Sequence, residues 1–293
     1  MNSRASRLHD MTDYLDRRVS KSAAWSRRLA SFSAVLFLTA GIAHRFGFLE
    51  TTGFIPVLGV VGGLAVLSLL LAAHAFVRLW NFGDSGGANL TVGVLIALLV
   101  LTPFALLVYR GLTYPMLHDI STDLEDPPAL RFAENTRTPE MNRVTAYSAE
   151  KRKLQLDNYP LVTGRRYALP FDRVSAAVAK VIEDRGWLIV SPRQSGQDSE
   201  TTVEALAYTL ILAFPADVAI RMTDEETSTY VDMRSSSRYG GHDFGENSAR
   251  IVAFLADLDD EIAALAGVAP VEPIEPVDAN PAEVDPGKTE PSG

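Results

Sequence analysis

Two long apolar runs without charged residues dominate the first part of this chain of 293 residues. Neither residues 53–77 nor residues 90–109 contain Asp, Glu, Lys or Arg. Each run reaches roughly the 20 residues that an α-helix needs to cross the hydrocarbon core of a bilayer. A third run, LASFSAVLFLTAGIA, precedes them and ends at His44 and Arg45, where the Arg45 side chain could extend to the membrane surface. The pattern therefore predicts three transmembrane helices within residues 29–110.

The run at residues 53–77 contains the spacing Gly59-x-x-x-Gly63. Two glycines one helical turn apart leave room for another helix to approach closely. We expect this face to pack against a neighbouring helix of the same small bundle, with a specific dimer face as the alternative.

In the second half of the chain, apolar residues recur at helical spacing in some segments and alternate with polar residues in others, which is typical of a folded α+β domain. FDRVSAAVAKVIEDRGW repeats apolar residues at helical spacing, with Asp172 as a possible cap and Gly186 as the stop. ENSARIVAFLADLDDEIAAL predicts a second amphipathic helix, whose apolar stripe runs from Ile251 to Leu265. Strands are predicted from β-branched, aromatic and alternating residues at RRYAL, WLIVS, TTVEALAYTLILAF, DVAIRM and STYVDMRSSSR. The expected fold class is α+β: an antiparallel sheet with two helices on one face, preceded by an all-α region of three transmembrane helices.

Changes in composition divide the chain into five expected segments. Residues 1–28 form a basic arm, and residues 29–110 form the three transmembrane helices. Residues 111–130, which include the acidic stretch HDISTDLEDPPAL, are expected to be a linker. Residues 131–266 form the α+β domain. Residues 267–293 repeat Pro with Glu or Asp and have no apolar periodicity, which predicts a disordered acidic tail.

The distribution of charge sets the expected orientation in the membrane. Short segments rich in Lys and Arg resist translocation, so the N-terminal arm is expected in the cytoplasm, and three crossings place the α+β domain on the opposite side. The formal net charge of -9 does not suggest a nucleic-acid partner, and a chain without cysteine has no thiolate metal ligand. We expect neither a metal ion nor a cofactor. The basic residues that decide the orientation are Arg4, Arg7, Arg17, Arg18, Lys21, Arg27 and Arg28.

The densest polar stretch, VDMRSSSRYGGHDFGENSARI, lies between the last predicted strand and the last predicted helix. One interpretation is structural, with a glycine turn and an aspartate that caps the helix. In this interpretation Arg234 and Arg238 pair across the sheet with Asp232, Asp217 or Glu204. The residues assigned to the turn and the cap are Gly240, Gly241, Asp243 and Gly245.

The second interpretation of this stretch is an anion site. A glycine turn before a helix presents free N–H groups, and neighbouring arginines add paired donors, which suits a phosphate headgroup or a carboxylate. The residues of this hypothetical site are Arg234, Arg238, His242, Asn247 and Arg250. Catalysis is the third interpretation, because Ser235, Ser237, His242 and Asp243 are residue types found in nucleophilic triads. No motif brings them together, so we assign no catalytic residue and do not expect an enzyme.

The same stretch carries a resemblance to a known family. Together with PPAL, YPLV, RGW and FPADVAIR in that order, it resembles the bacterial family known as domain of unknown function 1499 (DUF1499) over roughly residues 119–265. The most specific part is the succession Arg234, Ser235, Ser237, Arg238, Gly240 or Gly241, Asp243, Gly245, Asn247 and Arg250.

This resemblance implies a membrane-attached or exported α+β domain in bacteria, and no activity is established for the family. With the predicted spans, it places the protein in the bacterial inner (plasma) membrane, with the domain periplasmic or extracytoplasmic. We expect the domain to bind an envelope protein, or an anionic lipid or small molecule. A purely structural scaffold or assembly factor is the alternative, and a hydrolase is the weakest of the three.

Overall fold

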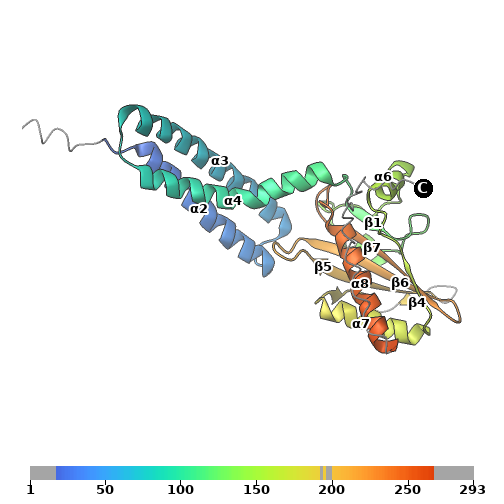
Figure 1. Ribbon diagram of the computed structural model, residues 1–293. Coiled ribbons are helices and arrows are strands. Elements are labelled where there is room, and N and C mark those ends of the chain that lie inside the picture. The colour runs from blue at the N-terminus through green and yellow to red at the C-terminus, as the bar shows by residue number, and fades with distance from the viewer. Residues whose placement is uncertain (1–17, 192–193, 196–199, 267–293) are drawn as a thin grey trace, which may run out of the picture.

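The computed structural model describes residues 18–191, 194–195 and 200–266. The expected basic arm up to residue 17 and the expected acidic tail, residues 267–293, lie outside these ranges. A bundle of long helices and a domain built on a sheet lie end to end (Figure 1).

Three helices lie side by side in the bundle (Figure 1): α2 (Lys21–Arg45), α3 (Thr51–Phe82) and α4 (Gly87–Thr113). Polar contacts join α2 to α3 near both ends of α2. Ser68 Oγ donates to Ser26 O at 2.8 Å, and His44 Nε2 lies 2.9 Å from Thr51 Oγ1. Such small polar residues satisfy one another where helices pack closely. The two helices are therefore in contact along most of α2.

Among the residues that the structure describes, two helices, α3 and α4, are long and apolar enough to cross a membrane. α2 falls short of this composition. Basic residues occupy its first turns, and His44 and Arg45 end it, so that its apolar run is shorter. The expected three apolar spans are therefore corrected to two, with α2 as a less apolar helix packed against both.

The glycine pair Gly59 and Gly63 does not pack against a helix of this bundle. A Cβ atom at either position would meet nothing within 4 Å. The close approach occurs instead at Gly93 of α4, where a Cβ would lie 2.7 Å from Ser26 Oγ and 2.9 Å from Arg27 N. The expectation that Gly59 and Gly63 face a helix of the same bundle was therefore wrong.

An antiparallel sheet forms the centre of the domain. Its strand order is β1-β7-β6-β5-β3, while β2 also pairs with β7 and β4 with β5. β1 lies within the segment expected as a linker, so the chain enters the sheet soon after α4 ends. The described strands are β1 (Asp119–Ser121), β2 (Arg165–Tyr167), β3 (Leu188–Ile189), β4 (Gln194–Ser195), β5 (Glu200–Tyr208), β6 (Pro215–Asp224) and β7 (Thr229–Ser237).

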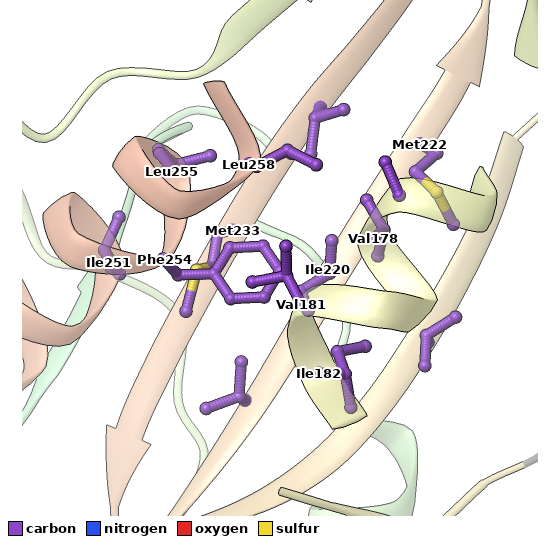
Figure 2. Close-up of a cluster of buried hydrophobic side chains, with 14 of the residues drawn as sticks. Val178, Val181, Ile182, Ile220, Met222, Met233, Ile251, Phe254, Leu255 and Leu258 are labelled. Atoms are coloured by element: carbon purple, nitrogen blue, oxygen red, sulfur yellow. The ribbon is translucent and has the colours of Figure 1, made fainter. Parts of the chain in front are cut away.

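Two helices, α7 (Phe171–Asp184) and α8 (Glu246–Ala266), cover one face of this sheet, as the sequence predicts. Figure 2 shows Phe254 of α8 and Val181 of α7 meeting Ile220 and Met233 from the strands. Burying these apolar side chains, each worth about 1.5–3 kcal/mol, holds the helices on the sheet.

The boundaries of α7 differ in one detail from the expected ones. Pro170 is the N-cap residue and makes no side-chain cap bond, while Asp172 lies inside the first turn. Asp172 still places a negative charge near the positive end of the helix dipole. Gly186 has a φ of 64° and ends the helix as expected.

The other face of the sheet is covered by residues 122–147, here called the cover, which are largely irregular and contain the short helix α5 (Arg131–Thr136). Leu130 and Ala133 pack on Ala219 of β6 and form a small apolar cluster there. Most of the remaining contacts on this face involve charged side chains. A second short helix, α6 (Ala149–Asn158), follows, and Leu154, Tyr159 and Val162 pack against the apolar core on the α7 and α8 side.

Candidate functional site

The covered face of the sheet carries a layer of charged residues. Antiparallel register places Asp217 opposite Ser236, Ala219 opposite Arg234, and Arg221 opposite Asp232. Successive side chains of a strand alternate between faces, so the charged residues share one side and the apolar core residues share the other. A charge buried in this way must be paired or hydrogen-bonded.

Arg234 is the most enclosed cation that the strands contribute to this layer. Its side chain is 5% exposed, and it makes two bonds to Asp119 of β1: Nε to Oδ1 at 3.0 Å and Nη2 to Oδ2 at 2.7 Å. Tyr147 donates its hydroxyl to the same carboxylate at 2.7 Å and places its ring 5.3 Å from the guanidinium. Burial opposes the charge of Arg234, but the bonds to Asp119 outweigh it and raise the pKa.

Asp217 accepts bonds from two arginines. Arg238 Nη2 lies 2.7 Å from Oδ1, and Arg137 Nη2 lies 2.8 Å from Oδ2. Arg137 also donates to the carbonyl oxygens of Asn142 and Ser236, at 2.7 and 3.0 Å. The cover and the sheet are therefore joined at Asp217 by two cations and one carboxylate.

Arg221 and Glu204 occupy the remaining charged positions. Arg221 Nη2 lies 3.0 Å from Asp232, and Nη1 lies 2.7 Å from Asp126 of the cover. Glu204 accepts the backbone N–H of Phe132 at 3.0 Å, at the start of α5. Burial raises the pKa of the Glu204 carboxyl, and backbone N–H groups oppose that rise.

The turn residues lie at the start of α8, as the structural interpretation predicts. Asp243 accepts the backbone N–H of Gly245 at 3.2 Å and of Asn247 at 2.7 Å, and so caps the helix. Gly240 and Gly245 have φ angles of 82° and 79°, which favour glycine. Gly241 has no such angle.

Asn247 and Arg250 lie on the helix side of β7. Arg250 Nη1 donates to Asn247 Oδ1 at 2.6 Å and to Ser235 Oγ at 3.0 Å. Asn247 Nδ2 donates to His118 O at 2.9 Å. Burial lowers the pKa of Arg250, opposed by the charges of Glu246 and Asp243.

The five residues of the hypothetical anion site are therefore divided between two faces. Arg234 and Arg238 lie on the covered face with carboxylate partners, while Asn247 and Arg250 lie under α8. His242 accepts the Phe244 N–H on Nδ1 at 2.9 Å and stacks on the Phe244 ring. Anion binding by this stretch stays a prediction. Arg238 pairs with Asp217 as the structural interpretation expects, whereas Arg234 pairs with Asp119 and not with Asp232, Asp217 or Glu204.

The same separation applies to the residue types of a catalytic triad. Ser235 Oγ donates to Asn247 at 2.8 Å, and Ser237 Oγ accepts from Asn247 at 3.0 Å. In the described part of the chain neither hydroxyl is bonded to His242. Across the same residues, no three His, Asp or Glu side chains are placed to hold a metal ion.

The turn before α8 also joins the domain to the bundle. Arg110 of α4 donates to Glu246, and a Cβ on Gly111 would touch the Phe244 ring at 3.4 Å. Gly245 packs so closely on Tyr114 that an added Cβ would lie 2.9 Å from its ring. The polar stretch therefore fixes β7, α8 and the end of α4 together.

An open cleft of about 1210 Å³ lies between the bundle and the domain. One wall is the connection from α2 to α3, with Arg45, Phe46 and Glu50. The domain contributes aromatic side chains and two arginines, Arg185 and Arg238. Arg238 is already paired with Asp217, and Arg185 lies 2.6 Å from Asp257. The domain side of the cleft also includes Thr138, Met141, Trp187, Tyr208 and Tyr239.

Arg45 differs from the other arginines of the cleft. Its Nη1 donates to the backbone carbonyl of Leu210 at 2.6 Å, and within the described residues no carboxylate lies within ion-pair distance of it. The sequence pattern indicates only that Arg45 ends a span. No local signal marks it, because its neighbours in the cleft come from the distant residues 138–141, 185–187 and 208–215.

No curated protein and no solved structure matches this chain. The C-terminal part, residues 119–258, matches the model of the family described as Protein of unknown function (DUF1499), which confirms the resemblance indicated by the sequence.

Proposed function

We propose that this is a membrane-anchored binding protein whose cleft receives an amphiphilic molecule with an anionic headgroup. The cleft between bundle and domain is the observation that carries the proposal. It combines aromatic and aliphatic walls with Arg45, a cation without a described carboxylate partner. The lining also includes several threonines and the carboxylates of Glu50 and Glu140. Apolar and aromatic walls with polar groups that fix the orientation of a ligand are typical of small-molecule sites. A guanidinium suits phosphate or carboxylate.

The position of the cleft supports a lipid-like ligand. It lies at the end of α2 and the start of α3, and α3 is one of the two helices with the composition of membrane spans. At 32 residues, α3 is roughly 48 Å long, more than the roughly 30 Å of a hydrocarbon core. A molecule from the adjacent leaflet would therefore reach the cleft without crossing much water.

The orientation of the anchor is part of the same proposal. α2 packs against α3 along most of its length, so α2 accompanies α3 through the bilayer although its composition is less apolar. With the basic arm in the cytoplasm, three crossings put the domain in the extracytoplasmic space of a bacterial inner membrane.

Reporter fusions will test this orientation. We expect a reporter that is active only outside the cytoplasm to work when fused after Leu265, because an odd number of crossings separates that point from the arm. The same reporter fused after Asp84, between α3 and α4, is expected to be silent. Activity at Asp84 and silence at Leu265 would reverse the proposed orientation.

Native mass spectrometry will test the ligand. The protein is purified in mild detergent, and we expect a recurrent phospholipid to remain bound. Thr138→Trp places a large ring at an exposed position of the cleft wall and should reduce the retained lipid severalfold. Thr227→Trp, at an exposed turn remote from the cleft, is the matched control and should retain it.

Two results would contradict the cleft as a lipid site. One is equal lipid retention by the Thr138→Trp and Thr227→Trp proteins. The other is a recurrent co-purifying protein with no bound lipid, which would favour the scaffold alternative.

A further inference from the structure

The loop between β5 and β6, residues 209–214, has the sequence TLILAF, which is unusual for a hairpin. Hairpin loops in water normally use Gly, Asn or Asp. Here Leu210 is 85% exposed and Ile211 is 79% exposed. The loop is nevertheless well organised, since Thr209 N donates to Phe214 O at 3.0 Å and Thr209 Oγ1 accepts from Phe214 N at 2.9 Å. Leu210 and Ile211 are therefore exposed in a loop whose conformation is fixed by hydrogen bonds.

Loop 209–214 is attached to the last turn of α2. His44 Nδ1 donates to Leu212 O, and Arg45 Nη1 donates to Leu210 O, both at 2.6 Å. Leu212 comes within 3.9 Å of the position that a Cβ on Gly41 would take. Gly41 lies a full turn before Arg45, so the loop lies beside the end of the bundle rather than beyond it.

An aromatic cluster fixes this attachment. The Phe214 ring lies 5.4 Å from His44 and 5.8 Å from Phe54, the latter on α3. His44 and Phe54 stack on each other at 4.4 Å. The tip of the hairpin is thus held at one level relative to α2 and α3.

Other exposed apolar side chains are found at this end of the bundle. They come from the α2–α3 connection and from the end of α4 and the residues after it. The exposed apolar side chains at this end are Phe46, Phe48, Tyr109, Leu112 and Met116. Large apolar surfaces that stay exposed mark interaction sites or membrane contacts.

We infer that loop 209–214 enters the membrane leaflet next to the domain, with Leu210 and Ile211 among the lipid acyl chains. This inference rests on the proposed anchor, because the loop shares its level with the end of α2 and α3. Leaving water is favourable for the two aliphatic side chains. The carbonyl groups of Leu210 and Leu212 already have donors in Arg45 and His44, as apolar surroundings require. The loop therefore provides the domain with a second contact with the bilayer, in addition to α4.

Site-specific quenching in vesicles will test the inference on the full chain. The natural sequence has no cysteine, so single-cysteine variants Leu210→Cys and Ile211→Cys can each carry one environment-sensitive fluorophore. The vesicles contain phosphatidylcholine and phosphatidylglycerol, with spin-labelled phosphatidylcholine as the quencher. Leu70→Cys, exposed on α3, is the reference within the anchor, and Thr227→Cys, on the β6–β7 turn, is the reference in water.

We expect severalfold stronger quenching at positions 210 and 211 than at position 227. Quenching at position 70 together with none at positions 210 and 211 would overturn the loop insertion and leave the anchor intact. Absence of quenching at position 70 would overturn the anchor itself. Apolar fluorescence at position 210 without lipid quenching would mean that protein, not lipid, covers the loop, and would also reject the inference.

Discussion

Arg234→Ala is expected to lower the unfolding free energy of the domain by about 3–5 kcal/mol, the range for removing one partner of a buried ion pair. The Asp119 carboxyl would then lose its cationic partner in a site that is nearly closed to water. Only the Tyr147 hydroxyl would remain as a described side-chain donor to its carboxylate. The variant would also lose the contact between the guanidinium and the Tyr147 ring.

Denaturant melts of the full protein in detergent will measure this loss. Trp187 stacks on Phe254 in the domain core at 5.3 Å, so its fluorescence reports unfolding of the domain. The two other tryptophans, Trp25 and Trp80, are in the bundle and are replaced by Phe in all samples. The measured transition then belongs to the domain.

Arg166→Ala is the matched control for Arg234→Ala. Arg166 makes a similar two-bond contact with Glu225, at 2.7 and 2.8 Å, but its side chain is 61% exposed. Water screens such a pair, so its loss should leave the unfolding free energy nearly unchanged.

Anion binding predicts a different outcome for Arg234→Ala. If Arg234 served a ligand, the variant would keep its stability, and phosphate would stabilise the parent protein alone through mass action. A stable variant with this phosphate effect would reject the structural role of Arg234. The bidentate contact with Asp119 leads us to expect the opposite result.

The secondary structure of the domain could be predicted because apolar and polar residues repeat at spacings that involve only near neighbours in the sequence. β6 alternates between core residues such as Ile220 and charged residues such as Arg221, and α8 repeats apolar residues at helical spacing. Both patterns depend only on neighbouring residues. The cap at Asp243 is similarly local, because it reaches only as far as Asn247.

The partners of the arginines could be predicted only where the register of adjacent strands provides them. Arg238 pairs with Asp217, one of the predicted carboxylates, and the two lie on neighbouring strands. Arg234 pairs instead with Asp119, which is 115 positions away in the segment expected as a linker. The pairing of β1 with β7 cannot be predicted from a local repeat of residue types, because the two strands are joined only when a long stretch of chain folds back.

The composition of the stretch TTVEALAYTLILAF is typical of a strand and predicts one extended run. β5 ends at Tyr208, and the following aliphatic residues form the loop attached to α2. Propensity alone does not separate an apolar strand from an apolar loop, because the same residue types make up both. The separation depends on the contact with His44 and Arg45, far away in the sequence.

Asp217→Ala is expected to be at least as destabilising as Arg234→Ala, with a loss of about 3–5 kcal/mol or more. A single carboxylate here serves both Arg137 and Arg238, so its removal leaves two neighbouring cations without their shared partner. Arg238→Ala should cost less, because Arg137 still pairs with Asp217. The same Trp187 melts will measure both variants, with the exposed Asp157→Ala as the control that should change little.

The double variant Asp217→Ala/Arg238→Ala separates repulsion from simple loss of contacts. Residues in one ion-pair network are not additive. Once Asp217 is absent, Arg238 contributes an unpaired and partly buried charge next to Arg137, so removing it should restore part of the stability lost in Asp217→Ala. A double variant that loses the full sum of the two single effects would show that Arg137, Arg238 and Asp217 act independently, contrary to their shared contacts on the covered face.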